Sequence, residues 1–277
     1  MNIIRWSAAI LALWATSLTT SYAVTDKVYS IGIVPQYETH RLHSIWQPIL
    51  NQLEKDTGLK FKIHGSANIP EFEKNFLSGK FDFAYMNPYH LILSLKSGGY
   101  IPLVRDHSKQ LQGVLVVRND SEITNVNQLD NQTLAFPSPN ALGASLLMRA
   151  ELKNKHKLNI NPIYVKSHDS VYLNVALKQT AAGGGVQKTL NRQKASISDK
   201  LKVLYRTQKV APHPFTAHKQ LDSIIVNKVM QAMLRMGTNE PGRKLLSQIP
   251  INKIGPASMK DYTPLSTMGL EYFRVIK

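Results

Sequence analysis

The sequence predicts an α/β protein of two lobes, each built on a mostly parallel sheet flanked by helices. Three observations lead to this fold class. Short apolar or alternating segments repeatedly give way to segments with apolar residues at helical spacing, which is typical of βαβ units. A chain of 277 residues with a hydrophobic fraction of 43% can fill the cores of two ordinary lobes. The order of these segments indicates a first block, a middle block and a return to the first.

The first block opens with an alternating strand from Val28 to Val34, which stops at Pro35. From His43 to Thr57 the apolar residues recur at helical spacing, and Gly58 follows as a C-cap residue. The remaining elements expected in this block are a strand at 59–64, a helix at 69–78, a strand at 80–85 and a helix at 89–96.

The middle block repeats the same alternation. Its expected elements are a strand at 112–118, a short helix at 127–129, a strand at 134–136, a helix at 141–155, a strand at 163–165 and a helix at 171–178. The run from Gly183 to Gly185 is interpreted as a turn. A strand at 202–206 and helices at 223–236 and 240–248 close the fold.

This order predicts lobe I over residues 27–112 plus 205–277 and lobe II over residues 113–204. In open α/β sheets, ligands lie beyond the carboxyl ends of the strands. We therefore expect a ligand cleft between the two lobes.

The N-terminus has the features of a cleavable export signal. Arg5 precedes an apolar segment from Trp6 to Leu18, and Ser21-Tyr22-Ala23 forms a small-x-small cleavage pattern. The apolar segment is about 13 residues long, whereas roughly 20 are needed to cross a bilayer. We therefore expect residues 1–23 to be a signal peptide and the mature protein to reside in the periplasm, with an uncleaved anchor as the alternative.

Composition narrows the classes of partner. The formal net charge of +16 favours anionic partners, but the basic residues are scattered and form no dense run, so no nucleic-acid partner is expected. The chain has no cysteine, which excludes a disulfide, a thiolate metal site and a lipidated cysteine. A monomer is the default expectation.

The sequence gives no support for catalysis or for a bound cofactor. Ser167 to Ser170 contains the residue types of a hydrolase triad, but neighbours in one turn cannot converge as nucleophile, base and orienting group. No nucleophile elbow, paired-histidine zinc motif or P-loop is present. His40 and His43 are spaced to chelate zinc, yet no further ligand is evident, so we interpret them as surface residues. We expect no enzyme activity, cofactor or metal.

Several segments, taken in chain order, are similar to those of a known family. They are the strand and turn at 80–85, the segment at 115–129, the loop at 135–143, the Ser-His-Asp turn at 167–169 and the closing segments at 201–206 and 240–246. They resemble the substrate-binding proteins of phosphate, phosphite and phosphonate ABC transporters. The resemblance implies the type II periplasmic-binding fold, with two lobes and a two-strand hinge. It also implies capture of a small oxyanion for an ABC permease in the inner membrane.

The resemblance carries over only part of the family's ligand positions. His168 matches the histidine of the Ser-His-Asp turn, and Tyr85 matches the aromatic residue after the third strand. A Ser-Thr-Ser run is replaced by Asn140-Ala141-Leu142, which leaves Ser138 as the nearest hydroxyl. Where many relatives carry an acidic residue that can bind a ligand amine, this chain has Ala and Gly at 181–185. A phosphonate with an amino group is therefore disfavoured.

Two loops run directly into helices, at 138–143 and 167–170. A helix N-terminus presents unpaired N–H groups and a partial positive charge, which together favour an oxyanion. Neutral tyrosine, asparagine, serine and histidine side chains can add hydrogen bonds. The candidate ligand-binding residues are Tyr37, Tyr85, Asn87, Ser138, Asn140, Ser167 and His168.

Other roles are open for some of these residues. Asn140 and Ser167 could be plain N-caps, and Tyr85 could pack with its hydroxyl at the rim. We expect His213, between two prolines near the return crossing, to be a hinge-loop residue, with contact to the ligand as the alternative. The function predicted is a periplasmic solute-binding protein for an ABC importer. The alternatives are a sensor that presents its ligand to a membrane histidine kinase, or a binder of a different organic anion.

Overall fold

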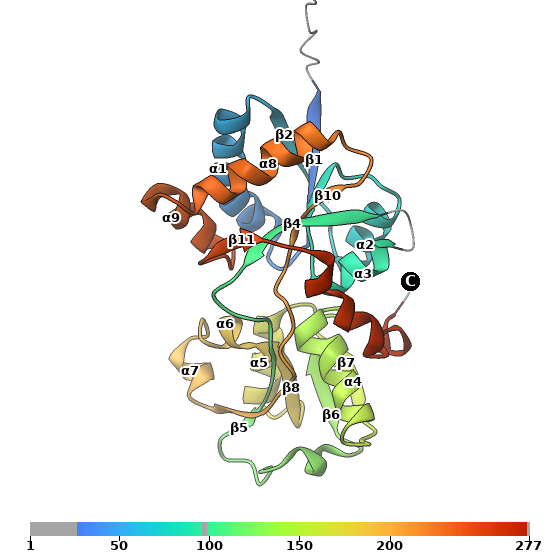
Figure 1. The fold of residues 1–277 in the computed structure, drawn as a ribbon. Coiled ribbons are helices and arrows are strands. Elements are labelled where there is room, and N and C mark those ends of the chain that lie inside the picture. Colours follow the sequence, from blue (N-terminus) through green and yellow to red (C-terminus); the bar gives the residue numbers. More distant parts are fainter. Residues whose placement is uncertain (1–26, 96–98, 276–277) are drawn as a thin grey trace, which may run out of the picture.

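The computed structural model describes residues 27–95 and 99–275, which form two lobes arranged end to end (Figure 1). The predicted signal peptide, residues 1–23, lies outside the described residues. Within the described ranges, no helix has the length and apolar character needed to cross a membrane.

Lobe I contains a sheet with the strand order β11-β4-β10-β3-β1-β2. Its strands are β1 (Val28–Ile33), β2 (Lys60–His64), β3 (Phe83–Tyr85), β4 (Tyr100–Asp106), β10 (Phe215–His218) and β11 (Ile254–Pro256). Its helices are α1 (Thr39–Thr57), α2 (Ile69–Leu77), α3 (Pro88–Leu95), α8 (Ser223–Met236) and α9 (Glu240–Gln248). Helices α1, α8 and α9 lie together on one side of the lobe, and α2 and α3 lie on the other (Figure 1).

Lobe II contains a sheet with the strand order β7-β6-β8-β5-β9. Its strands are β5 (Gly113–Arg118), β6 (Thr133–Phe136), β7 (Asn161–Tyr164), β8 (Ala182–Val186) and β9 (Leu201–Arg206). Its helices are α4 (Leu147–Asn154), α5 (His168–Ala176), α6 (Gln187–Leu190) and α7 (Ala195–Ser198). A 3-10 turn at Val126–Leu129 and a π turn at Leu142–Leu146 precede β6 and α4 respectively. Separate apolar clusters fill the two faces of this sheet.

The lobes are joined by two crossing segments, one between β4 and β5 and one between β9 and β10. The crossing segments pair with each other, because the N–H groups of Leu111 and Val210 donate to each other's carbonyls at 2.8 and 2.9 Å. After β11 the chain continues through 3-10 turns at Met259–Asp261, Thr263–Thr267 and Leu270–Phe273, and the last of these contacts α4 of lobe II. The C-terminal segment is therefore a third connection between the lobes.

Local sequence signals explain the first block well. The expected strand at 28–34 is β1, and the expected helix at 43–57 is the C-terminal part of α1. Gly58 ends α1 in the left-handed region, with φ of 67°, and its N–H donates to the carbonyl of Glu54. Glycine adopts this conformation without steric cost, so the predicted C-cap is confirmed.

The run from Gly183 to Gly185 is a strand, β8, and the prediction of a turn there is wrong. A Cβ atom on Gly184 would lie 2.0 Å from the carbonyl oxygen of Ala144, and one on Gly185 would lie 2.1 Å from Tyr172 Oη. The glycines are therefore required because helices lie directly against the middle of the sheet. Three consecutive glycines are typical of a turn. In this strand, however, glycine is needed because larger side chains would overlap the helices packed against it.

The prediction of mostly parallel sheets is also wrong in detail, because both sheets are mixed. The pairs β1–β2, β1–β3, β6–β7 and β6–β8 are parallel. The pairs that involve β4, β5 or β10 are antiparallel. Strands β4, β10 and β11 were not expected from the sequence; β10 and β11 are only four and three residues long, and β4 contains Pro102. Strands β10 and β11 are too short to show a recognisable periodicity. In β4 the proline argues against a strand when the sequence is read alone.

The expected helix at 141–155 is split into a π turn and α4. The N–H groups of Ser145 and Leu146 both donate to the carbonyl of Ala141, at 2.8 and 3.0 Å. Leu142 and Leu146 are buried in the apolar cluster of lobe I, although they belong to lobe II. The start of this helix therefore serves as an apolar contact between the lobes.

The carboxyl ends of the parallel strands in the two lobes face each other. Asn140 follows β6 and bonds to Glu73 of lobe I, and Arg192 follows β8 and bonds to Tyr37, which itself follows β1. Because β7 is parallel to β6, its carboxyl end and the start of α5 lie at the same edge. The loops that the sequence marks as binding loops are therefore directed toward the opposite lobe.

Candidate functional site

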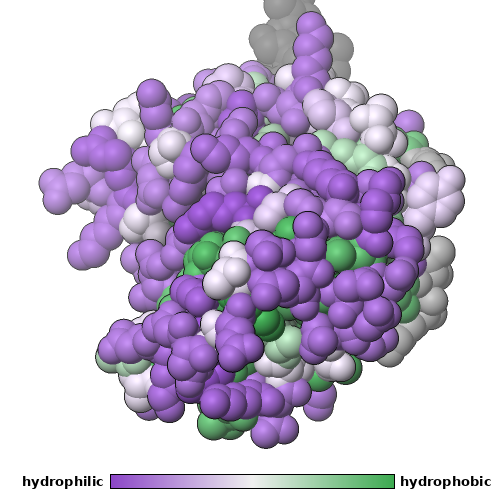
Figure 2. All heavy atoms as spheres, turned by 90° about the horizontal axis from the view of Figure 1, so that it is seen from below, coloured by the Kyte–Doolittle hydropathy of each residue, from purple (hydrophilic) through white to green (hydrophobic). Residues whose placement is uncertain are grey.

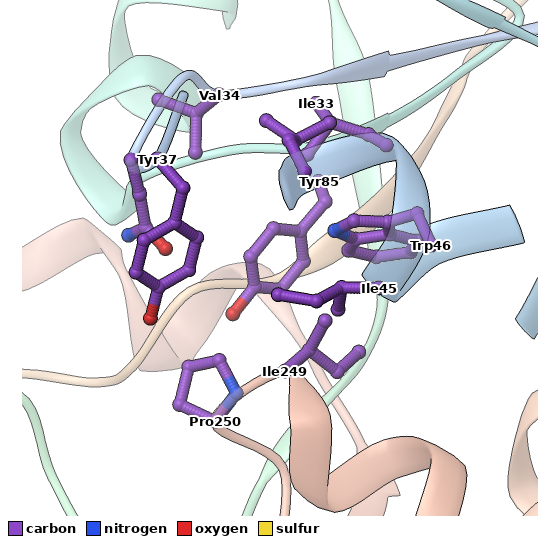
Figure 3. A pocket seen from close by; sticks show the side chains of 10 residues that line it. Ile33, Val34, Tyr37, Ile45, Trp46, Tyr85, Ile249 and Pro250 are labelled. Atoms are coloured by element: carbon purple, nitrogen blue, oxygen red, sulfur yellow. The ribbon is translucent and has the colours of Figure 1, made fainter. Parts of the chain in front are cut away.

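The lobe I side of the candidate site contains two of the predicted tyrosines. Tyr37 and Tyr85 line one small pocket, together with Trp46, Ile249 and Pro250, and their hydroxyl groups point to the same side (Figure 3). The Tyr85 ring is 2% exposed and lies 5.0 Å from Trp46, centroid to centroid. Burial raises the pKa of Tyr85 well above its usual value, so its hydroxyl remains a neutral donor.

His213 lies on the other face of Tyr85, with ring centroids 5.6 Å apart and nearly parallel planes. Its Nε2 is 2.7 Å from Gln36 Nε2, so with the amide as donor the ring is neutral and accepts at Nε2. Burial, followed by the charge of His90, lowers its pKa to about 3. The expectation that His213 is a simple hinge-loop residue missed this buried contact with Tyr85. The flanking Pro212 and Pro214 were the only signal in the sequence.

The lobe II side contains Ser167 and His168 at the start of α5. Ser167 is the N-cap, and its hydroxyl accepts a hydrogen bond from the N–H of Ser170 at 3.1 Å. Its predicted capping role is therefore observed. His168 is the first residue of the helix, and its Nδ1 is buried without a hydrogen-bond partner among the residues that the structure describes. Burial lowers the pKa of His168 to about 4, against a smaller opposing effect of Asp169, so the ring is neutral at pH 7.

The loop after β6 contributes backbone groups more than side chains. Ser138 is half-buried, and its carbonyl accepts from the N–H of Ala141 at 3.3 Å. Leu142 is buried in the apolar cluster of lobe I, so its side chain does not face a ligand between the lobes. The N–H groups of Gly143 and Ala144 find no acceptor within the described residues. At this helix start, backbone N–H groups are thus the donors left for a ligand.

The structure places Asn87 and Asn140 together, but in a buried polar network instead of beside the tyrosines. Asn87 Oδ1 caps α3 by accepting from the N–H of His90 at 3.0 Å, and its Nδ2 lies 3.5 Å from the carbonyl of Asn140. Asn140 donates from Nδ2 to Glu73 Oε1 at 3.1 Å and to the carbonyl of Val275 at 2.9 Å. Both amide groups are therefore engaged within the protein.

Glu73 is the centre of this network. Its carboxylate is 2.8 Å from Arg274 Nη2 and 3.2 Å from His90 Nε2. Burial tends to raise the pKa of Glu73, but the hydrogen bonds and charges of His90 and Arg274 outweigh it and lower the pKa overall. The ionised Glu73 thus links lobe I to the C-terminal segment, while Asn140 links both to lobe II.

Across the lobe interface, Arg192 Nη1 donates to the Tyr37 hydroxyl at 3.0 Å. The side chains of Arg41 and Arg192 also lie over the Tyr37 ring, at 4.7 and 5.8 Å from its centroid. Neither arginine was predicted as a site residue, because an isolated cation carries no signal of its role in the sequence.

The arrangement favours binding of an oxyanion. It offers neutral donors on two facing edges, namely tyrosine hydroxyls on one side and a histidine ring and free N–H groups on the other. Within residues 27–95 and 99–275, no three histidine or acidic side chains converge as a metal site. His40 and His43 are exposed on α1.

Comparisons with known proteins agree with this geometry. Residues 31–262 match the family described as "ABC transporter, phosphonate, periplasmic substrate-binding protein". The chain is 20% identical over 259 residues to the phosphonates-binding periplasmic protein of Escherichia coli strain K12, covering 88% of this chain and 77% of that protein. It is 20% identical over 255 residues to the phosphate-import protein PhnD of Mycolicibacterium smegmatis, covering 82% and 79%.

A solved structure shows the same fold. PhnD1 from Prochlorococcus marinus, in complex with methylphosphonate, superposes with a TM-score of 0.79 at 16% identity, covering 90% of this chain and 100% of that chain. The two-lobe α/β architecture is thus the one predicted, and the family match spans most of the chain that the structure describes. The chain belongs to the periplasmic substrate-binding proteins of phosphonate ABC transporters.

Proposed function

We propose that the protein binds a small phosphorus oxyanion between its lobes and delivers it to an ABC permease. The ligand class comprises phosphonate, phosphite and phosphate. The observation that carries this proposal is His168 at the first turn of α5, whose buried Nδ1 has no hydrogen-bond partner within residues 27–95 and 99–275. A buried polar atom without a hydrogen bond is costly, so a ligand oxygen at this position would remove that cost.

Several donors would share the oxygens of such a ligand. His168 donates from Nδ1, and the N–H groups at the start of α5 and of the π turn add helix-terminal donors. On the opposite edge, Tyr37 and Tyr85 present neutral hydroxyls. The helix-start donors belong to lobe II and the tyrosines belong to lobe I. One ligand between them can therefore contact both lobes.

Ligand binding in this arrangement favours the form in which the lobes are closest. A ligand shifts a conformational equilibrium only through contacts that differ between the two states, and bridging contacts exist only when the lobes approach. Small-angle scattering should therefore show a smaller radius of gyration with bound ligand than without it. An unchanged radius at saturating ligand would contradict closure.

Export of the protein and release of the ligand complete the proposed role. Residues 1–23 would be removed as a signal peptide, so that the mature protein is free in the periplasm. The protein would act as a monomer and would release its ligand chemically unchanged. No nucleic acid, metal or cofactor takes part in this function.

The direct test is a thermal-shift and calorimetric screen of the protein without residues 1–23. Phosphate, phosphite, methylphosphonate, aminoethylphosphonate, sulfate and acetate form the panel. A phosphorus oxyanion at one hundred times its dissociation constant should stabilise the protein by about 2.7 kcal/mol, which corresponds to a shift of several degrees. Equal shifts with sulfate or acetate, or no shift with any phosphorus oxyanion, would contradict the proposed ligand class.

A further inference from the structure

A cluster of basic side chains lies beside the candidate oxyanion site, and the function described so far does not use it. Lys188 is half-buried on α6, directly after β8 and four residues before Arg192, and Arg192 and Arg41 both lie over the Tyr37 ring. Burial, followed by the charges of Arg192, Lys109 and Arg41, lowers the pKa of Lys188. Two of the four residues, Lys188 and Arg192, belong to lobe II. Arg41 lies on α1 of lobe I, and Lys109 lies on the first crossing segment. The cluster therefore forms where the two lobes meet.

Tyr37 connects this cluster to the candidate site. Its hydroxyl accepts from Arg192, its ring lies under both Arg41 and Arg192, and it lines the same pocket as Tyr85. Tyr37, which is proposed to face the oxyanion, thus contacts two guanidinium groups.

The four cations have no acidic partner. In the described part of the chain, none of Lys188, Arg192, Arg41 and Lys109 forms an ion pair with Asp or Glu. Like charges brought together in this way repel, and burial of one of them increases the cost. Both effects lower the pKa of Lys188 to about 8, with burial as the larger cause. An anion in the cluster would relieve this repulsion.

The sheet order sets the distance between the cluster and His168. Strands β7, β6 and β8 are neighbours, and they lead at the same edge to His168, Ser138 and Lys188 respectively. Neighbouring strands are about 4.8 Å apart, so the first and last of these positions are separated by roughly 10 Å along the edge. Long lysine and arginine side chains can span much of that separation, which leaves room for a short ligand.

We propose that Lys188, Arg192 and Arg41 form a second anion subsite, and that the ligand of this protein carries a second acidic group in addition to its phosphorus oxyanion. This inference rests on the proposed function, because it extends the same site toward β8. It also accounts for the residues at 181–185: they offer no acidic side chain to a ligand amine, and cations follow them. The ligand class is thus an anionic phosphonate or phosphate ester with a carboxylate or a second phosphoryl group a few bonds from the first.

The test compares matched ligands by calorimetry. Phosphonocarboxylates with one to four CH2 groups between phosphorus and carboxylate are each paired with the alkylphosphonate that lacks only the carboxylate. At least one phosphonocarboxylate should bind more than tenfold tighter than its pair. If alkylphosphonates bind but no phosphonocarboxylate binds tighter, the second subsite is refuted and the proposed function stands. If no member of either series binds but phosphate or phosphite does, the second subsite is refuted and the proposed function stands; if none of these anions binds, both are refuted.

Substitutions locate the effect in the cluster. Lys188→Gln and Arg192→Gln should each reduce affinity for the best phosphonocarboxylate at least tenfold more than affinity for its alkylphosphonate pair. Lys200→Gln is the matched control, because Lys200 is an exposed lysine of the same lobe outside the cluster, and it should change neither affinity. Equal losses for the two ligands in the cluster variants, or the same differential loss in Lys200→Gln, would overturn the assignment.

Discussion

Asn140 of lobe II donates from Nδ2 to both carboxylate oxygens of Glu73 in lobe I, at 3.1 and 3.2 Å. The same asparagine accepts from the N–H of Val275 at 3.0 Å. Arg274 completes the contact by pairing with Glu73. Three segments that are far apart in sequence thus meet in one buried polar network, and this network holds the C-terminal segment against both lobes.

We expect Glu73→Gln to lower the free energy of unfolding by about 3 kcal/mol, because it leaves Arg274 partly buried without its counter-charge. Chemical denaturation measures this change. Glu38→Gln is the control, since Glu38 is exposed and its side chain caps no helix, and its effect should stay below about 0.5 kcal/mol. A loss in Glu73→Gln no larger than in the control would show that the network contributes little.

We expect His168→Ala to weaken methylphosphonate binding at least tenfold, which is about 1.4 kcal/mol, while the fold is retained. The physical reason is the loss of the Nδ1 donor at the start of α5. Titration calorimetry measures the affinity, and circular dichroism checks the fold. His43→Ala, at an exposed position on α1, should bind as the wild type does. Unchanged affinity in His168→Ala would remove this residue from the site.

We expect Gly184→Ala to destabilise lobe II by about 3 kcal/mol, since its Cβ would overlap the carbonyl oxygen of Ala144 and the ring of Phe136. Backbone atoms cannot move aside as a flexible side chain can. Gly65→Ala is the matched control, because nothing lies within 4 Å of its Cβ position. Equal melting temperatures for the two variants would contradict the close packing of the π turn on β8.

We expect stability to fall between pH 7 and pH 5 because of His168 and His213. Their pKa values in the folded protein are about 4 and about 3, below the usual 6.5, so in this range the unfolded chain binds protons that the folded protein does not. Above pH 7 both states are neutral at these groups and the effect vanishes. Denaturation at a series of pH values measures the slope.

The variant His213→Gln should flatten that slope while keeping a side chain that can bond to Gln36. Buried carboxylates such as Glu73 and Asp106 also have lowered pKa values, but their contribution is lost only as the pH falls below their usual range near 4. A slope between pH 7 and pH 5 that is the same in the variant and the wild type would rule out His213 as a cause.

The sequence revealed those elements whose start, end or periodicity depends on residues only a few positions apart in the chain. Gly58 marks the end of α1, Ser167 marks the start of α5, and the alternation before Pro35 marks β1. Each is a hydrogen bond or a periodicity within a few residues, so a single sequence can reveal it. The same reasoning placed His168 at a helix start, where the structure has it.

The sequence by itself determined the two-lobe α/β class and local elements such as β1, the end of α1 and the start of α5. The tertiary structure decided the role of Gly184, the engagement of Asn140 by Glu73 and the meeting of Arg192 with Tyr37. The partners in these contacts lie 40, 67 and 155 positions apart in the chain. Such contacts depend on how closely separate elements pack and which charges they bring together. No local pattern of residue types encodes that information.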